Sequence, residues 1–345
     1  LGDVYKRQIL LILKAHEGRS LMNTPEFFPH PLLAHPQAQT AFAAFVAKPV
    51  KLQKTERLWV ELDDGDALLL NQESPVSEDP SKPIVLLLHG LGGSGDGSLI
   101  VRQSAKLNQF GYIALRLNHR GCGTNAQHRA KQIYHSGRTA DIAATLKFIA
   151  QRWPGRSVLA VAYSLSGNML LKLLGVANTA ELHNLKAALA VCPPIDLEQC
   201  SLALSAPHNR HIDRFFSFMV TRQARQRQKV HQHQPSRTLP YGLTLREFDA
   251  NYTAPEAGFA SRDDYYQQCS SVSVLNNITT PTMILAAGDD PIIPSAIFRS
   301  AVPSHLELRV EKFGGHMGFY AANNTSYGDK RWLDAYVLDW VKSRI

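Results

Sequence analysis

A series of short, continuous apolar segments is the feature of this sequence that most constrains its fold. The first is PIVLLLHG at residues 83–90, and five similar segments follow at 112–121, 157–164, 187–194, 282–290 and 306–316. A continuous apolar run of this length that ends in glycine is typical of a strand buried on both faces of a sheet. We therefore expect a sheet that other elements cover on both sides.

The segments between the first of these strands have a different pattern. Amphipathic stretches with helical spacing occupy 99–109, 138–152 and 167–176. Strands that alternate with helices predict a mostly parallel, twisted sheet with crossover helices on both faces. Upstream, RLWVELDDGDALLL at 57–70 alternates around an Asp-Gly turn and predicts a β-hairpin.

The alternation stops between Pro194 and Pro281, where the sequence is polar, basic and helix-like. We interpret this region as a helical cap insertion over the carboxyl ends of the strands. The predicted domain organisation is a core in two parts, 27–197 and 275–345, separated by a cap at 198–274.

Charge and cysteine content limit the classes of function. The chain of 345 residues has a formal net charge of +8, and much of the excess lies within 209–237. This stretch lacks the interleaved aromatic residues and the fold motif of a nucleic-acid-binding surface, so we expect a solvated cap helix and no nucleic acid partner. The four cysteines form no C-x-x-C pair, which argues against a zinc site or a disulfide framework and favours reduced thiols in a cytoplasmic protein.

The amino-terminal segment 1–21 is expected to lie outside the fold, as an artefact or a disordered leader. Its first eight residues, LGDVYKRQ, resemble a translated sequencing adapter, and Met22 is our expected natural start. The apolar run Ile9–Leu13 is too short to cross a bilayer and has no secretory cleavage pattern. We expect a soluble protein.

A serine stands where a predicted strand meets a predicted helix. In AVAYSLSGNMLL at 160–171, Ser164 is flanked by Ala162 and Ser166, where the hydrolase pattern G-x-S-x-G has glycines. A tight strand-to-helix turn would expose its hydroxyl beside backbone N–H groups that can stabilise an oxyanion. The alternative interpretation is a serine that caps the helix.

Two further predicted strands end in residues that could complete a catalytic triad. GDDPIIP at 288–294 places two carboxylates before a proline, and FGGHMGF at 313–319 places a histidine in a glycine-rich loop. The chain order serine, aspartate, histidine is the order found in α/β-hydrolases. Their coincidence in this order favours catalysis over three unrelated structural roles.

Motifs along nearly the whole chain from about Phe27 strengthen this hypothesis. They are HPQAQTAF (35–42), ERLWVELDDGD (56–66), HGLGG (89–93), NHRGCGT (118–124), YHSGRTADI (134–142), YSLSGN (163–168), REFDANYTAPEAGF (246–259), DDYY (263–266), GDDPIIP and GGHMGF. With these motifs the sequence resembles the α/β-hydrolase family of bacterial YheT-like hydrolases and their eukaryotic lung-type relatives. The run from RGC to YHSGRTAD is the most diagnostic, because general α/β-hydrolases do not share it.

The resemblance implies an α/β-hydrolase fold with Ser164 as nucleophile, His316 as base and Asp290 as acid. Asp290 is preferred because the acid of the family directly precedes the proline; Asp289 and then Asp196 are the alternatives. The family usually has glycine where Ala162 and Ser166 stand, which affects the geometry of the elbow but not the assignment.

Two backbone N–H groups are expected to form the oxyanion hole. One belongs to Leu165, directly after the nucleophile, and the other to Leu91 in the HGLGG loop. The competing interpretation of GLGGSGDG at 90–97 is a phosphate or dinucleotide cradle, but it matches neither G-x-G-x-x-G nor the P-loop. We therefore expect no cofactor.

Other polar and aromatic residues receive structural predictions. The three loop histidines are expected to brace loops and to hold no metal, and three further polar residues to form a buried network under the site. The four apolar residues of the cap either line an acyl pocket or pack the cap on the core. These groups are His89, His119 and His135; Arg120, Tyr134 and Asp141; and Phe215, Phe216, Phe218 and Met219.

The sequence thus predicts a serine carboxylesterase that cleaves short- to medium-chain acyl esters through an acyl-enzyme. Two alternatives stay open. The same triad could transfer the acyl group to an alcohol or thiol or act on lipid esters, with transient contact with membrane lipids. The chain could also be a non-catalytic binding protein. Its oligomeric state is left open.

Overall fold

The computed structural model describes residues 24–46, 50, 52, 55–178, 182–232 and 237–345. The expected leader 1–21 and the expected start at Met22 lie outside the described residues. Within the described residues, no helix combines the length and the apolar character that a membrane span requires.

One sheet of eight strands forms the centre of the molecule, in the order β1-β2-β4-β3-β5-β6-β7-β8. β2 pairs antiparallel with β1 and with β4, and every other neighbouring pair is parallel. The predicted mostly parallel sheet and its leading hairpin are confirmed. The strands are β1 (Thr55–Glu61), β2 (Ala67–Glu73), β3 (Ile84–Leu88), β4 (Ala114–Asn118), β5 (Val158–Tyr163), β6 (Leu185–Val191), β7 (Thr282–Ala287) and β8 (Glu307–Glu311).

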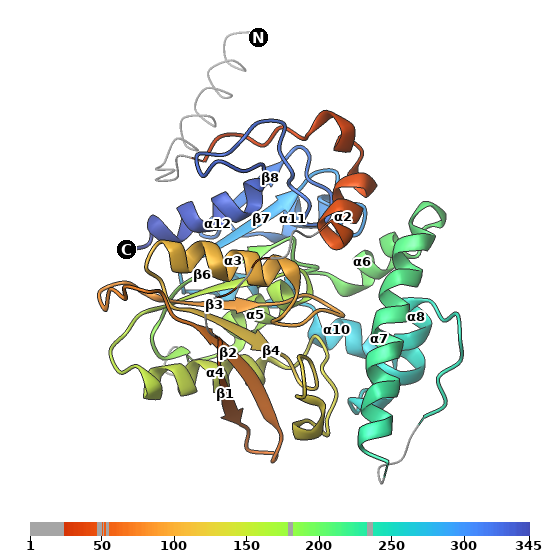
Figure 1. The fold of residues 1–345 in the computed structure, drawn as a ribbon. Coiled ribbons are helices and arrows are strands. Elements are labelled where there is room, and N and C mark those ends of the chain that lie inside the picture. The colour runs from red at the N-terminus through yellow and green to blue at the C-terminus, as the bar shows by residue number, and fades with distance from the viewer. Residues whose placement is uncertain (1–23, 47–49, 51, 53–54, 179–181, 233–236) are drawn as a thin grey trace.

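Helices cover both faces of the sheet, which explains why strands at its centre, such as β3 and β5, are continuously apolar. In β3, Ile84, Leu86 and Leu88 belong to one core cluster, and Val85 and Leu87 belong to the other. The first cluster includes apolar residues of α4 (Thr139–Arg152), α5 (Leu165–Val176) and α11 (Ala296–Ala301), and the second includes those of α3 (Ser98–Gln109) and α12 (Trp332–Lys342) (Figure 1). Alternate side chains of one strand are thus buried on opposite faces.

Helices occupy the region between β6 and β7, where the sequence pattern changes. The long helix α7 stands along one side of the molecule, apart from the sheet (Figure 1). The elements of this region are α6 (Leu197–Leu204), η4 (Pro207–Asn209), α7 (Arg210–Val230), α8 (Leu245–Phe248), the π-helical segment η5 (Asp249–Thr253), α9 (Ala254–Glu256), α10 (Arg262–Cys269) and η6 (Val272–Asn277). The remaining helices are η1 (Pro31–Leu33), α2 (Pro36–Phe45) and η2 (Gln127–Arg129).

The parallel strands bring distant parts of the sequence to one edge of the sheet. The loop that begins at His89 follows β3, Ser164 follows β5, Asp290 follows β7 and His316 follows β8. Because the carboxyl ends of parallel strands meet at the same edge, these four segments gather there. This edge is where a ligand site is expected in an open α/β sheet.

Candidate active site

Ser164 occupies a strained turn between β5 and α5. Its φ of 52° and ψ of −122° are unusual for a residue with a side chain, and its N–H donates to the carbonyl of Val191 at 2.8 Å. The Ser164 side chain makes no capping hydrogen bond to α5. The helix-cap interpretation is therefore wrong, and the strain is of the kind that proteins retain at functional turns.

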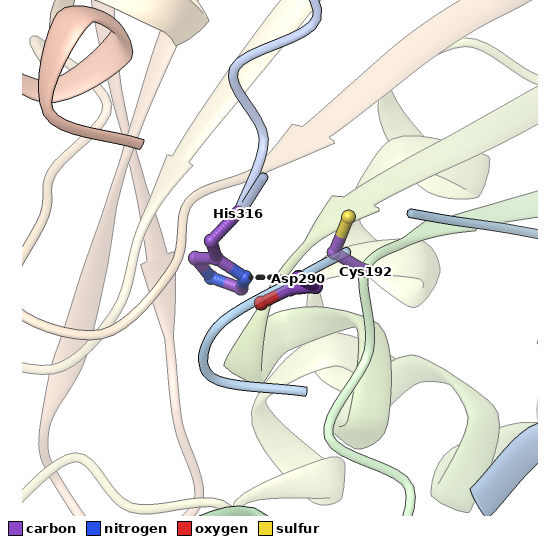
Figure 2. A group of neighbouring side chains, drawn as sticks. All are labelled: Cys192, Asp290 and His316. Atoms are coloured by element: carbon purple, nitrogen blue, oxygen red, sulfur yellow. Dashed lines mark hydrogen bonds and ion pairs between the residues drawn. The ribbon is translucent and has the colours of Figure 1, made fainter. Parts of the chain in front are cut away.

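The Ser164 hydroxyl contacts His316, and His316 contacts Asp290. Ser164 Oγ lies 2.9 Å from His316 Nε2, and His316 Nδ1 lies 2.8 Å from Asp290 Oδ2, the contact dashed in Figure 2. Both side chains of the His316–Asp290 pair are almost inaccessible to solvent. A buried chain of hydroxyl, imidazole and carboxylate can move a proton from the hydroxyl to the imidazole while the carboxylate stabilises the imidazolium.

Two loops hold the imidazole and the carboxylate in place. Asp290 Oδ1 accepts hydrogen bonds from the N–H groups of Ile292 and Ile293 at 2.8 and 3.0 Å. The N–H of His316 donates to Thr40 Oγ1 of α2 at 2.9 Å. Gly315 has a φ of +56°, and a Cβ there would lie 2.4 Å from the carbonyl oxygen of Pro36, so only glycine lets the histidine loop pass this close to α2.

The two alternative acids have other partners. Asp289 accepts a hydrogen bond from the N–H of Gly315 at 2.9 Å and so braces the histidine loop from behind. Asp196 accepts from the N–H of Gln199 at 3.0 Å and caps α6. Of the three carboxylates that the sequence offered, Asp290 is the one hydrogen-bonded to His316.

The HGLGG loop lies directly against the serine. A Cβ at Gly90 would lie 3.1 Å from Ser164 Cβ, so a larger residue there would crowd the nucleophile. Leu91 follows Gly90 and lines the same pocket as Ser164 and Leu165. Leu165 is the first residue of α5, where a backbone N–H has no helical partner.

Ser166, which stands where the family usually has glycine, links the elbow to this loop. Its Oγ donates a short hydrogen bond to the carbonyl of His89 and lies 2.7 Å from His119 Nε2. Since the hydroxyl proton goes to His89, the Ser166 oxygen accepts from the N–H of His119. The replacement is therefore accommodated by two buried hydrogen bonds that glycine could not make.

The three loop histidines fall into two places. His89 and His119 pack edge to face with ring centroids 4.7 Å apart, and the Tyr134 ring stacks on His119 at 4.5 Å. His135 lies apart, with its ring edges against Phe259 and Tyr265. Burial lowers the pKa of His89 to about 4 and the pKa of His135 to about 3. Burial also holds the pKa of His119 well below its usual value, and the neighbouring His89 lowers it further. All three are neutral at pH 7.

The predicted polar network is present for two of its three residues. Arg120 pairs with Asp141, Asp64 and Asp66 at 2.7 Å each. Tyr134 belongs instead to the histidine cluster, so the prediction was wrong for it: its ring stacks on His119 because the loops after β3 and β4 converge there. Arg120, Asp66 and Asp141 are buried, whereas Asp64 is exposed. Removing one of the three buried groups would leave a buried charge without its partner, so they stabilise these loops only as a set.

Two cavities meet beside the serine. A small pocket of about 90 Å³ is lined by Ser164, His316 and apolar side chains that include Phe216, Ile292 and Ile293. A second cavity of about 400 Å³ has a more polar wall that includes Met219 and Gln223. The residues common to both walls are Leu91, Leu165, Leu245, Asp249 and Tyr265.

The four apolar cap residues that the sequence placed in one group have different surroundings in the structure. Phe216 lines the small pocket and Met219 the larger cavity. Phe215 is half-buried and packs against Phe216 with ring centroids 5.8 Å apart. Phe218 does neither of the two things expected, because it lies on the outer face of α7 and is 63% exposed.

Asp249 is a site residue that sequence reasoning missed. It lies in the wall between the two cavities, within the π-helical segment, and accepts a hydrogen bond from Tyr266 Oη at 2.8 Å. Burial raises its pKa to about 6. Its signal was the motif REFDANYTAPEAGF, which was noted without a role for any single residue. A π-helical turn of this kind is often found at functional sites.

Cys192 is a second neighbour that the sequence did not indicate. It follows β6 with a φ of 47°, and its thiol lies beside the carboxylate of Asp290 (Figure 2). One ligand atom from each of Cys192, Asp290 and His316 lies within 4.8 Å of the others. A metal ion held there would have to break the hydrogen bond between His316 and Asp290. Burial raises the pKa of the Cys192 thiol and keeps it neutral.

Comparison with known proteins identifies the family. The family model described as the alpha/beta hydrolase fold matches residues 83–322, which is more than half of the chain. Escherichia coli (strain K12) YheT, a candidate esterase, is 30% identical over 335 residues, covering 94% of this chain and 95% of its own. The chain belongs to the YheT-like family of α/β-hydrolases.

Two more comparisons place this α/β-hydrolase among its relatives. The medium-chain fatty acid ethyl ester synthase/esterase 2 of Saccharomyces cerevisiae is 27% identical over 301 residues, covering 79% of this chain and 66% of its own. A solved arylesterase structure has the same fold with a TM-score of 0.56 at 13% identity, covering 90% of this chain and 91% of its own. The likeness to these two proteins extends over most of the α/β-hydrolase chain.

Proposed function

We propose that this α/β-hydrolase is a serine carboxylesterase that hydrolyses short- to medium-chain acyl esters through an acyl-enzyme on Ser164. The observation that carries the proposal is the hydrogen-bonded chain from Ser164 through His316 to Asp290. The similarity to a candidate esterase and to an ester synthase/esterase supports ester bonds as the target.

In the proposed reaction, the hydrogen bond to Asp290 keeps the proton on Nδ1 of His316. Nε2 then accepts the proton of Ser164 as its oxygen attacks the acyl carbon. The N–H groups of Leu91 and Leu165 hold the oxyanion. His316 returns the proton to the leaving alcohol, and water, deprotonated by the same imidazole, releases the acid and restores the serine.

The helices of the region 198–274 would act as the cap that sets chain length. Phe216 from α7 and Leu204 from α6 close the small pocket, and its volume of about 90 Å³ suits a short or medium acyl chain. The larger cavity on the other side of Leu91 and Leu165 would take the alcohol. The four cysteines are buried free thiols, which fits a cytoplasmic location.

Acyl transfer with the same residues is the second candidate function. The cavity of about 400 Å³ could hold an acceptor alcohol, and the yeast relative is named for synthesis as well as hydrolysis of ethyl esters. Product analysis in added ethanol distinguishes the two, since transfer yields an ethyl ester above the uncatalysed level and hydrolysis yields the free acid alone.

Replacement of Ser164 tests the proposal. We expect Ser164→Ala to abolish p-nitrophenyl ester hydrolysis and labelling by a fluorophosphonate probe, because among the described residues no other hydroxyl is hydrogen-bonded to the imidazole of His316. Ser201→Ala is the matched control, since this serine lines the same pocket but does not contact His316. Activity that survives in Ser164→Ala would exclude this nucleophile, and a folded wild-type protein that resists the probe would favour a non-catalytic binding protein.

A further inference from the structure

The outer face of α7 carries a row of cations without acidic partners. Within the described residues none of the five cations forms an ion pair, and the one acidic residue of α7, Asp213, is buried and accepts a hydrogen bond from the N–H of Leu245. The row also contains Phe218, which is 63% exposed. Its members recur every three or four residues and so share one face of the helix: Arg210, Arg214, Phe218, Arg222, Arg225 and Lys229.

A second aromatic side chain lies beside this row. Tyr241 is 89% exposed, and the guanidinium of Arg225 lies 4.0 Å from the centre of its ring. A hollow of about 750 Å³ separates α7 from the segment 240–243 and is lined by Phe218, Tyr241 and several of the cations. We call the six-residue row, Tyr241 and this hollow the basic face.

The basic face adjoins the catalytic side of the molecule. Arg222 and Gln226 line both the outer hollow and the inner cavity of about 400 Å³. That inner cavity shares Leu91 and Leu165 with the pocket that contains Ser164. A molecule bound at the basic face would thus be separated from the proposed nucleophile by two adjoining cavities.

We propose that the basic face docks on an anionic lipid bilayer, from which the enzyme takes its ester substrate. Lipid phosphates would bind the unpaired cations, and Phe218 and Tyr241 would enter the headgroup region, where aromatic side chains are favoured. A bilayer fits better than a nucleic acid because the basic face adjoins cavities that lead to an apolar acyl pocket. This inference rests on the proposed function for the substrate, but the docking itself is independent of Ser164.

Vesicle sedimentation of the full chain tests the docking. We expect the wild-type protein to bind vesicles of phosphatidylglycerol with phosphatidylcholine, and not vesicles of phosphatidylcholine alone. The double variant Arg214→Gln/Lys229→Gln should bind about 25-fold more weakly, since each cation near an anionic surface contributes roughly fivefold. Phe218→Ser should also weaken binding. Both variants should keep wild-type hydrolysis of a water-soluble p-nitrophenyl ester, because none of these side chains lines the pocket that contains Ser164.

The control is the double variant Lys147→Gln/Lys186→Gln, which removes the same number of positive charges. These two lysines are exposed on α4 and at the start of β6, outside the basic face. Equal loss of vesicle binding in this control would overturn the proposal by showing a response to net charge alone. Absence of binding to anionic vesicles, or tighter binding of a single-stranded oligonucleotide that depends on the same residues, would overturn it as well. Failure of ester hydrolysis alone would leave the vesicle result unchanged and would count against the proposed function instead.

Discussion

At the scale of single residues, Ser166 replaces a glycine of the usual elbow pattern and makes hydrogen bonds of its own. Ser166→Gly restores the family pattern but removes the hydrogen bonds to His89 and His119. We expect kcat for p-nitrophenyl esters to fall about tenfold with little change in KM, because the loop that holds the proposed oxyanion donor Leu91 loses its attachment to the elbow. The free energy of unfolding should fall by about 1–3 kcal/mol, since a buried N–H loses its acceptor.

Ala162→Gly is the matched control for this variant. It restores the other glycine of the pattern without removing a hydrogen bond, and Ala162 is fully buried in β5. We expect kcat to stay within about twofold and stability to fall by about 1 kcal/mol, the usual cost of glycine inside a strand. The positioning role of Ser166 would be refuted if the Ser166→Gly and Ala162→Gly enzymes had the same kcat and the same rate of labelling by the fluorophosphonate probe.

The sequence indicated which side chains could react, but it did not indicate all of the residues that contact them. Ser164, Asp290 and His316 each lie in a loop or turn that follows a strand, and they occur in a recognisable order, so they could be named from the chain alone. The partners of Ser166 come from the loops after β3 and β4, and Cys192 comes from the end of β6. Such contacts depend on how neighbouring loops pack, which a linear pattern does not encode.

At the scale of elements, α7 presents different neighbouring residues to the pocket and to the outer face. Phe216 lines the small pocket, whereas Phe218, two residues on, is exposed. Phe216→Ala should enlarge the pocket and raise the ratio of kcat/KM for decanoyl over butyryl p-nitrophenyl esters by roughly tenfold, the lower end of what one methylene group contributes in an apolar pocket. Phe218→Ala is the control and should leave the ratio unchanged. An unaltered ratio in Phe216→Ala would show that α7 does not limit chain length.

Elements of the sheet could be predicted more fully than those of the region 198–274. A strand buried on both faces is continuously apolar, so β3, β5, β6 and β7 were each visible on their own. The expectation of burial on both faces was wrong for β8, whose residues are mostly exposed because it lies at the end of the sheet. Helices that pack on one side show only a weak amphipathic pattern, and several here are very short. The π-helical segment Asp249–Thr253 has no local sequence signal, because it depends on packing around Asp249 and Tyr266.

At the scale of the whole molecule, burial of neutral histidines links the stability of the fold to pH. The pKa of His89 is lowered to about 4 and that of His135 to about 3, both mainly by burial, against about 6.5 in the unfolded chain. Below pH 6.5 the unfolded chain binds protons that the folded chain excludes, so acid favours unfolding. Asp249 acts in the opposite direction, because its raised pKa of about 6 lets the folded chain take up a proton first.

His119, whose pKa burial also lowers, acts in the same direction as His89 and His135, and Asp213 and Asp289, whose pKa burial raises, act with Asp249. We expect the three histidines to outweigh these carboxyls, so the free energy of unfolding should be highest above pH 6.5 and fall as the pH is lowered toward 4. Each histidine contributes about 1.4 kcal/mol per pH unit once its unfolded form is protonated. His135→Asn should lower the slope of unfolding free energy against pH by the contribution of one histidine, because asparagine does not titrate in this range. The variant should still fold, since the amide oxygen of asparagine can accept the hydrogen bond that the N–H of Gly137 donates to His135 Nδ1 at 3.1 Å. Urea unfolding at pH 7, 5.5 and 4.5 measures both slopes. His128→Asn is the control, because His128 is exposed and its replacement should leave the slope unchanged. Equal slopes in the wild-type protein, His135→Asn and His128→Asn would mean that burial of His135 does not govern the response to acid.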